Sequence, residues 1–175
     1  PDLRAAQARD LSAPPPRGEA AHRFAGERRS LFSMRSKFQD IEVFQHEGYV
    51  SMYLDGELQL TSRFGDFYHE ALVHPAMAAL GPRGKRVLVV GAGDGGVATA
   101  LLQYPVELVV QVEIDRDVVR AAKRFLPAYA PSFEDPRLKL VYRDAARWVA
   151  AQAAGGGRRG GLFDLCVVDT TDQPL

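Results

Sequence analysis

VLVVGAGDGG, residues 87–96, is the stretch that decides the fold of this chain. Its first four residues are all apolar, which is typical of a strand buried on both faces of a parallel sheet. A glycine-rich turn follows, and residues 97–102 then predict the start of a helix. A strand, a glycine turn and a helix N-terminus together form the corner at which α/β proteins bind nucleotides.

An acidic residue inside this turn narrows the class of ligand. The glycine spacing fits the pattern G-x-G-x-x-G, which alone is weak support for a dinucleotide site. A pyrophosphate would lie at the helix N-terminus, where the helix dipole and the N–H groups favour an anion. The carboxylate of Asp94 would repel that anion. The turn therefore favours a positively charged ligand over NAD.

Composition excludes several classes of function. The 175 residues suffice for one domain, or for a domain with a small appendage, and 46% of them are hydrophobic. The 22 basic residues balance 22 acidic ones, so nothing favours nucleic acid or a membrane surface. The single cysteine, Cys166, excludes an intrachain disulfide and favours a reducing, cytoplasmic compartment. Because the chain begins at Pro1, we expect a fragment or processed product, and organelle targeting stays open.

The residues before the glycine turn predict a leader and a small β unit. Residues 1–30 are rich in Ala, Arg and Pro, so we expect a mobile leader. Acidic residues among its arginines argue against a transit peptide. Residues 31–65 predict an antiparallel β unit in which Asp55-Gly56 is a two-residue hairpin turn. Its strands are expected over 38–44, 49–54 and 57–61, with Phe38, Ile41 and Val43 pointing inward.

A helix is predicted between the β unit and the first parallel strand. It covers residues 66–80, and Pro75 predicts either a kink or a division into two short helices. The residues expected near its buried face are Tyr68, Leu72, Met77 and Leu80.

Strands and helices alternate from residue 87 onwards. The predicted strands are 87–90, 106–112, 138–142 and 162–168. The predicted helices are 97–103, 116–126 and 145–153, and the glycine-rich residues 155–161 predict a flexible loop. This alternation predicts the α/β class, with a doubly wound parallel sheet and right-handed crossovers.

Each of the four predicted parallel strands is followed by an acidic residue. These residues are Asp94, Glu113, Asp144 and Asp169. In such sheets ligands bind beyond the carboxyl ends of the strands, so the four carboxylates should surround one site. Glu113 follows Gly96 by 17 residues, close to the separation expected for an acid that holds a ribose. A lone acid after a strand is usually a helix cap, and this alternative stays open for Asp144.

The sharpest local motif is DTTD, residues 169–172. Two carboxylates three residues apart can converge on one pocket, and their repulsion raises the pKa of at least one. Such a carboxylate is a usable proton acceptor. An Asx-turn that ends the strand is the better interpretation of this motif alone. Asp94 is expected at the same edge of the sheet. When Asp94 is taken into account, a binding site for cationic amines becomes the better interpretation of the motif.

An ordered set of motifs resembles the polyamine aminopropyltransferases, the family of spermidine synthase and its spermine and thermospermine relatives. The resemblance covers residues 33–175. The motifs are SKFQDI (36–41), LDGELQ (54–59), YHE (68–70), HP (74–75), GAGDGG (91–96), VEID (112–115) and DTTD (169–172).

This resemblance implies transfer of an aminopropyl group from decarboxylated S-adenosylmethionine to putrescine or spermidine, a step of polyamine biosynthesis. It implies no permanently bound cofactor and no metal, with the decarboxylated nucleoside acting as cosubstrate. The implied partner is a small amine rather than nucleic acid or membrane, and the complete protein is expected to be a homo-oligomer. The implied fold is a methyltransferase-type, Rossmann-like sheet, with a partial catalytic domain over residues 66–175 that is incomplete at the C-terminus.

The resemblance also implies roles for individual residues. Asp169 would be catalytic and accept the proton of the attacking amine, while Asp172 and Tyr68 would bind and orient that amine. Asp94 would hold the ammonium of the aminopropyl arm, and Glu113 the ribose hydroxyls. The other cosubstrate-binding positions would be Asp144 at the adenine, Gln39, Gln59, Gly91, Gly93 and Gly95.

Four features depart from the family pattern. RFGDF, residues 63–67, replaces an acidic pair followed by an aromatic residue, and Arg143-Asp144-Ala145 replaces Gly-Asp-Gly. Gln173 separates the DTTD motif from Pro174. The chain also stops at Leu175, whereas the family continues with strands and helices that close the acceptor pocket. We therefore expect the isolated chain to be inactive.

Two other functions stay open. A small-molecule methyltransferase on the same fold would bind S-adenosylmethionine itself, but Asp94 would repel the carboxylate of that cosubstrate. A non-catalytic chain would bind a nucleoside or partner without turnover. An NAD-dependent oxidoreductase ranks last because of Asp94.

Overall fold

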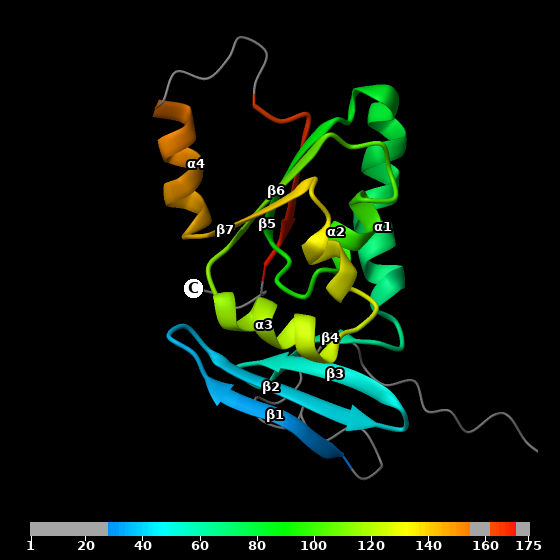
Figure 1. Ribbon diagram of the computed structural model, residues 1–175, viewed down its shortest axis with the longest axis vertical. Helices are drawn as coiled ribbons and strands as arrows, with labels where there is room; N and C mark the ends of the chain where they lie inside the picture. Colours follow the sequence, from blue (N-terminus) through cyan, green and yellow to red (C-terminus); the bar gives the residue numbers. More distant parts are fainter. Residues whose placement is uncertain (1–27, 155–161, 171–175) are drawn as a thin grey trace, which may run out of the picture.

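Two four-stranded sheets lie one above the other in the computed structural model, which describes residues 28–154 and 162–170 (Figure 1). Most of the predicted leader, the predicted loop over 155–161 and Asp172 lie outside the described residues. None of the described helices is both long and apolar enough to cross a bilayer.

The antiparallel sheet has the order β1-β2-β3-β4. Its strands are β1 (Arg29–Arg35), β2 (Asp40–His46), β3 (Tyr49–Leu54) and β4 (Glu57–Thr61). The predicted hairpin turn is confirmed, because Asp55 and Gly56 connect β3 to β4 with φ of 49° and 82°. β1 is a strand that the sequence did not predict. Its first residue, Arg29, falls inside the leader expected from the composition of residues 1–30.

One of the three predicted inward positions in this sheet is wrong. Ile41 and Val43 are fully buried, as expected. Phe38 is 42% exposed because β2 begins only at Asp40, which leaves Phe38 in the β1–β2 turn. The period of two therefore holds within the strand but does not extend into the turn.

The second sheet is parallel and confirms the predicted α/β architecture. Its order is β7-β6-β5-β8, so the first strand in sequence is central and the chain winds outward in both directions. The strands are β5 (Arg86–Gly91), β6 (Leu108–Glu113), β7 (Leu138–Tyr142) and β8 (Leu165–Asp169). Each lies within three residues of its predicted bounds.

Helices cover the parallel sheet on both faces. α1 and α2 lie on one side and α4 on the other, while α3 lies between the two sheets (Figure 1). The helices are α1 (Gly65–Leu80), α2 (Gly96–Leu101), α3 (Arg116–Phe125) and α4 (Ala145–Ala154), with short 3₁₀ turns η2 (Gly81–Arg83) and η3 (Ala130–Glu134).

Side chains of the central strand alternate between two apolar clusters. Val87 and Val89 are fully buried against α1 and α2. Leu88 faces the other cluster, where it meets Val110 of β6 and Trp148 of α4. Burial on both faces explains why this strand is a continuous apolar run in the sequence.

α1 buries Met77, as predicted, but Leu72 and Leu80 are only half-buried and the centre of its buried face lies elsewhere. Its buried residues are Gly65, His69, Val73 and Met77, which recur every four residues. Tyr68 is 54% exposed, so its assignment to the core face is wrong. Division into two helices is also wrong, because α1 runs unbroken through Pro75. Pro75 and Ala71 are both exposed, so water can satisfy the carbonyl that Pro75 leaves without an amide partner.

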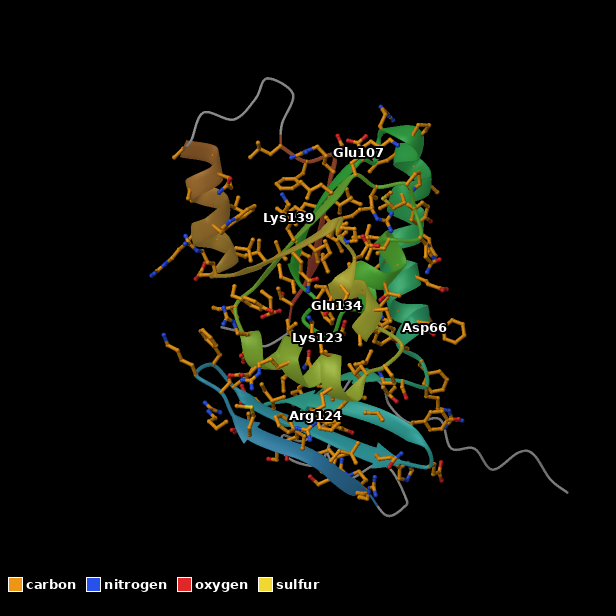
Figure 2. The ribbon with its side chains drawn as sticks, viewed as in Figure 1. Asp66, Glu107, Lys123, Arg124, Glu134 and Lys139 are labelled. Carbon is orange, nitrogen blue, oxygen red and sulfur yellow. The ribbon has the colours of Figure 1, made fainter. Side chains whose placement is uncertain are left out.

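α3 joins the two sheets. Val118, Val119 and Ala122 pack against Ile41 and other buried residues of the antiparallel sheet. Lys123 of α3 also pairs with Glu134 of η3 at 2.7 Å (Figure 2). That pair is exposed and links α3 to η3 rather than to the antiparallel sheet, so the stability of the junction between the sheets rests on the apolar contact.

Replacing Ile41 with alanine should therefore lower the free energy of unfolding by about 2–5 kcal/mol, because it empties the contact between the sheet and α3. Urea unfolding followed by circular dichroism measures the change. Phe38→Ala is the matched control, with an expected change below about 0.5 kcal/mol. Equal losses in the two variants would contradict the placement of β2.

Candidate active site

A cavity of about 900 Å³ opens at the carboxyl ends of the parallel strands, between them and β3–β4 of the antiparallel sheet. The predicted site residues that line it are Gln39, Gln59, Tyr68, Gly91, Gly93, Asp94, Glu113, Asp144 and Asp169. Gly95 does not line the cavity, because it is buried behind the turn against Phe133. Asp172 lies outside the described residues.

The glycine turn is held in shape from two neighbouring strands. Gly91 and Ala92 both have positive φ, of 80° and 58°. The amide of Ala92 donates to the backbone oxygen of Asp169 at 2.8 Å, which ties the turn to the end of β8. Nε2 of Gln111, a fully buried residue of β6, donates to the carbonyls of Gly91 and Ala92 at 3.0 and 2.7 Å. Gln111 was not singled out from the sequence, where it is one polar residue within an apolar strand.

Asp94 fills the position that a phosphate would need. Its Oδ1 accepts the amide of Gly96, the first residue of α2, at 2.7 Å. A carboxylate therefore already occupies the helix N-terminus, which agrees with the expectation that this turn disfavours pyrophosphate. Its Oδ2 accepts from Nε2 of His69 at 3.2 Å.

His69 is a buried partner of Asp94 that the sequence did not mark as functional. It lies on the inner face of α1 and is 2% exposed. Its ring occupies the space that a Cβ on residue 96 would need, which explains the glycine there. Tyr68 and Tyr129 flank the ring edge to face, each at 5.4 Å between centroids. The YHE motif was visible in the sequence, but only packing shows which of its residues turns inward.

Two opposing effects act on the pKa of His69. Burial lowers it, whereas the hydrogen bond to Asp94 and the charges of Asp94, Asp169 and Asp66 raise it. The raising effects prevail, so the pKa lies above 6.5. The contribution of the His69–Asp94 pair to folding stability is fully present below pH 6.5. It is lost as the pH rises through the pKa that His69 has in the folded protein.

Replacing Asp94 with asparagine should therefore move the pKa of His69 from above 6.5 to below it, because burial then acts without its main opponent. Titration of the imidazole signals by NMR measures both values. A His69 midpoint below 6.5 in the unaltered chain would contradict the ion pair.

Tyr68 and Asp169 meet across the cavity although 101 residues separate them. The hydroxyl of Tyr68 donates to Oδ1 of Asp169 at 2.7 Å. One ligand atom from each of His69, Asp94 and Asp169 lies within 4.8 Å of the other two. Because Nε2 of His69 donates to Asp94, the two carboxylates are the members of this set that suit a cationic group such as an ammonium.

Glu113 lines the same cavity from the end of β6. Burial raises its pKa, and the charges of Asp115 and Asp94 add to that rise, while backbone amides of residues 115 and 114 oppose it. Its Oε1 accepts the amide of Asp115 at 2.8 Å. A Cβ on Gly93 would lie 3.0 Å from its Oε2, so the glycine gives this carboxylate room. Glu113 is buried, so it is not a carboxylate solvated at the end of a strand.

Asp144 caps a helix and also lines the cavity. Its Oδ1 accepts the amide of Arg147 at 2.9 Å and so caps α4. The same carboxylate lines the cavity beside Arg143.

The two glutamines enter from the antiparallel sheet. Gln39 donates from Nε2 to Oδ2 of Asp115 at 3.0 Å. Gln59 of β4 donates to its own strand, at the carbonyl of Glu57, at 3.3 Å. Both side chains therefore reach the cavity while held by neighbours.

The unusual stretch over residues 63–67 has a structural explanation. A Cβ on Gly65 would lie 2.5 Å from both Leu60 Cδ1 and the Tyr129 hydroxyl, so larger residues are excluded there. Tyr129 donates to Asp66 at 2.9 Å. Burial, followed by this hydrogen bond, raises the pKa of Tyr129. The acid of this stretch is thus turned toward Tyr129, and Phe67 is exposed.

Comparison with known proteins agrees with this geometry. The spermine/spermidine synthase domain model matches residues 65–175. A polyamine aminopropyltransferase of Alkalilimnicola ehrlichii is 39% identical over 147 residues, which are 83% of this chain and 49% of that protein. Polyamine aminopropyltransferase 1 of Hyperthermus butylicus is 38% identical over 81% of this chain and 48% of its own length. The chain thus spans about half the length of the curated relatives it matches.

Solved structures show the same fold. A crystal structure of a spermidine synthase in complex with the transition-state analogue AdoDATO matches with a TM-score of 0.73 and 32% identity, over 82% of this chain and 47% of that one. The spermidine synthase of Thermotoga maritima matches with a TM-score of 0.72 and 31% identity, over 81% and 48%. With carboxylates at all four strand ends and a family model that covers most of its length, this chain belongs to the spermine/spermidine synthase family.

Proposed function

We propose that the complete protein transfers an aminopropyl group from decarboxylated S-adenosylmethionine to a diamine or polyamine such as putrescine or spermidine. One observation carries this proposal: Asp94 and Asp169 converge in a cavity that Glu113 and Asp144 also line. Such a cavity complements a molecule with a cationic arm and a nucleoside body. The similar spermidine synthase structure with a transition-state analogue supports the same ligand class.

The nucleoside would lie along the strand ends with its cationic arm at the glycine turn. Glu113 would accept hydrogen bonds from the ribose hydroxyls, and Asp144 would face the adenine. Asp94, which is fixed by the Gly96 amide and His69, would hold the ammonium of the aminopropyl arm. Ordinary S-adenosylmethionine carries a carboxylate beside that ammonium, and Asp94 would repel it.

Asp169 would act on the acceptor amine. The amine nitrogen must lose its proton before it attacks the aminopropyl carbon next to the sulfonium, and Asp169 would accept that proton. The new C–N bond forms as the C–S bond breaks, its electron pair returns to sulfur, and methylthioadenosine leaves. Tyr68, hydrogen-bonded to Asp169, would orient both this carboxylate and the amine. Asp172 would contribute a second carboxylate for the amine.

The 175-residue chain by itself is expected to form no polyamine product, because it spans only about half the length of its relatives. Mass spectrometry of a reaction with decarboxylated S-adenosylmethionine and putrescine tests this expectation. The complete protein in the same buffer is the positive control. Spermidine formed by the isolated chain would refute it.

Calorimetry with the complete protein tests the ligand selectivity on which the proposal depends. We expect decarboxylated S-adenosylmethionine to bind at least about tenfold more tightly than S-adenosylmethionine, because a carboxylate near Asp94 costs about 1.4 kcal/mol or more. Tighter binding of S-adenosylmethionine would favour a methyltransferase. Equal binding of methylthioadenosine and both cosubstrates would favour a nucleoside-binding protein without turnover.

A further inference from the structure

We propose that Asp115 is a positioning residue that sets which end of the Gln39 amide faces the cavity. Asp115 follows β6 and is 1% exposed, and it does not line the cavity itself. Gln39 does line it, at the entry to β2. The inference rests on the proposed function, because its main readout is the binding of a nucleoside cosubstrate.

Asp115 is surrounded by hydrogen-bond donors. Its Oδ1 accepts the amide of Asp117 at 2.9 Å, which caps α3. Its Oδ2 accepts the hydroxyl of Ser36 at 2.6 Å and Nε2 of Gln39 at 3.0 Å. Oγ of Ser36 in turn accepts the amide of Gln39, and its single proton is shared between two acceptors, the Gln39 carbonyl at 3.1 Å and Asp115 at 2.6 Å. The shorter contact with the charged acceptor directs this proton to Asp115.

This arrangement leaves one orientation for the Gln39 amide. Oδ2 of Asp115 is an acceptor, as its bond from the Ser36 hydroxyl shows. It can form a hydrogen bond with the NH₂ end of the Gln39 amide but not with the amide oxygen. Because Nε2 of Gln39 is turned to Asp115, Oε1 is the end that remains for a ligand in the cavity. In this orientation the amide oxygen, an acceptor, is the end of Gln39 that is offered to the cavity, and the NH₂ group is the end that faces Asp115.

The same residue also sets a second acceptor. The backbone amide of Asp115 donates to Oε1 of Glu113 at 2.8 Å, while its side chain holds Gln39. Both lining groups then present oxygens to the cavity. This polarity suits ribose hydroxyls and an ammonium group, all of which are donors.

Two substitutions that exchange polarity across this contact test the proposal in the complete protein. Asp115→Asn keeps an oxygen for the α3 cap but places an NH₂ group against Nε2 of Gln39, so the Gln39 amide should turn over. We expect Asp115→Asn to weaken methylthioadenosine binding by about tenfold. Gln39→Glu places two carboxylates in contact and should weaken binding by a similar factor. The double variant pairs an amide with a carboxylate, again presents an oxygen, and should bind within about threefold of the unaltered protein.

A matched control separates this effect from loss of charge at the start of α3. Asp117→Asn removes a carboxylate two residues away that pairs with Arg120 and does not line the cavity. It should change methylthioadenosine binding by less than about twofold. Equal binding by Asp115→Asn and the unaltered protein, or a double variant no better than Gln39→Glu alone, would overturn the proposal.

Urea unfolding of the same proteins without ligand provides a readout independent of the proposed function. Gln39→Glu should destabilise the protein that retains Asp115 and should leave the stability of Asp115→Asn unchanged or higher. If the unaltered protein binds no nucleoside, the proposed function fails while this comparison still decides the role of Asp115. Destabilisation by Gln39→Glu to the same extent in both backgrounds would reject it.

Discussion

Asp169→Asn in the complete protein is expected to lower kcat by about 10²–10⁴-fold, because a positioned proton acceptor contributes a factor of that size. Asparagine has nearly the same shape and retains an oxygen for the Tyr68 hydroxyl, which donates to Asp169 at 2.7 Å. The dissociation constant for decarboxylated S-adenosylmethionine should therefore change by less than about threefold. Steady-state kinetics and calorimetry on the same preparation measure the two quantities.

Glu107→Gln is a suitable control for the loss of one carboxylate. Glu107 is exposed at the opposite end of the parallel sheet, where β6 begins (Figure 2). Its replacement should leave kcat within about twofold of the unaltered protein. Turnover by Asp169→Asn within tenfold of the unaltered protein would remove Asp169 from the role of proton acceptor.

Asp94→Asn is expected to weaken binding of decarboxylated S-adenosylmethionine by about 10- to 150-fold, the range for loss of a hydrogen bond to a charged group. Methylthioadenosine has no ammonium, so its affinity should fall by less than about threefold. Asparagine still offers an oxygen to the amide of Gly96, which leaves the glycine turn in place. The difference between the two ligands therefore isolates the charge.

Calorimetry with both ligands on one preparation makes this comparison. Equal losses of affinity would mean that Asp94 acts through the shape of the turn and not through the ammonium. His69→Gln tests the contribution of the histidine separately from that of Asp94. The Asp94 carboxylate remains in this variant, so the preference for decarboxylated S-adenosylmethionine over methylthioadenosine should persist.

The parallel half of the fold was predictable because local signals agreed with one another. Apolar runs such as residues 87–90 are long enough to show burial on both faces, and glycine or proline bounds most of them. Placing an acid after each strand then predicted the cavity, since all parallel strands end at one edge. β1 escaped prediction because its seven residues are mostly exposed and alternate poorly.

Contacts across long sequence separations could not be predicted. Tyr68 carries an apolar ring at a helix position that suggested burial, yet its hydroxyl meets Asp169, which lies 101 residues away. The neighbouring His69 turns inward instead, because Gly96 leaves space for its ring. Gln39 and Asp115 are 76 residues apart, so only the packing of β2 against α3 shows their contact. Periodicity reports which residues are buried but not which polar partners they meet.

Turnover by the complete protein with a panel of amines is the most direct test of the central claim. Decarboxylated S-adenosylmethionine and either putrescine or spermidine should give an aminopropylated amine and methylthioadenosine in equal amounts, measured by mass spectrometry. S-adenosylmethionine in its place should give neither product. Methylated amine from S-adenosylmethionine, or no product from decarboxylated S-adenosylmethionine with any amine, would contradict the claim.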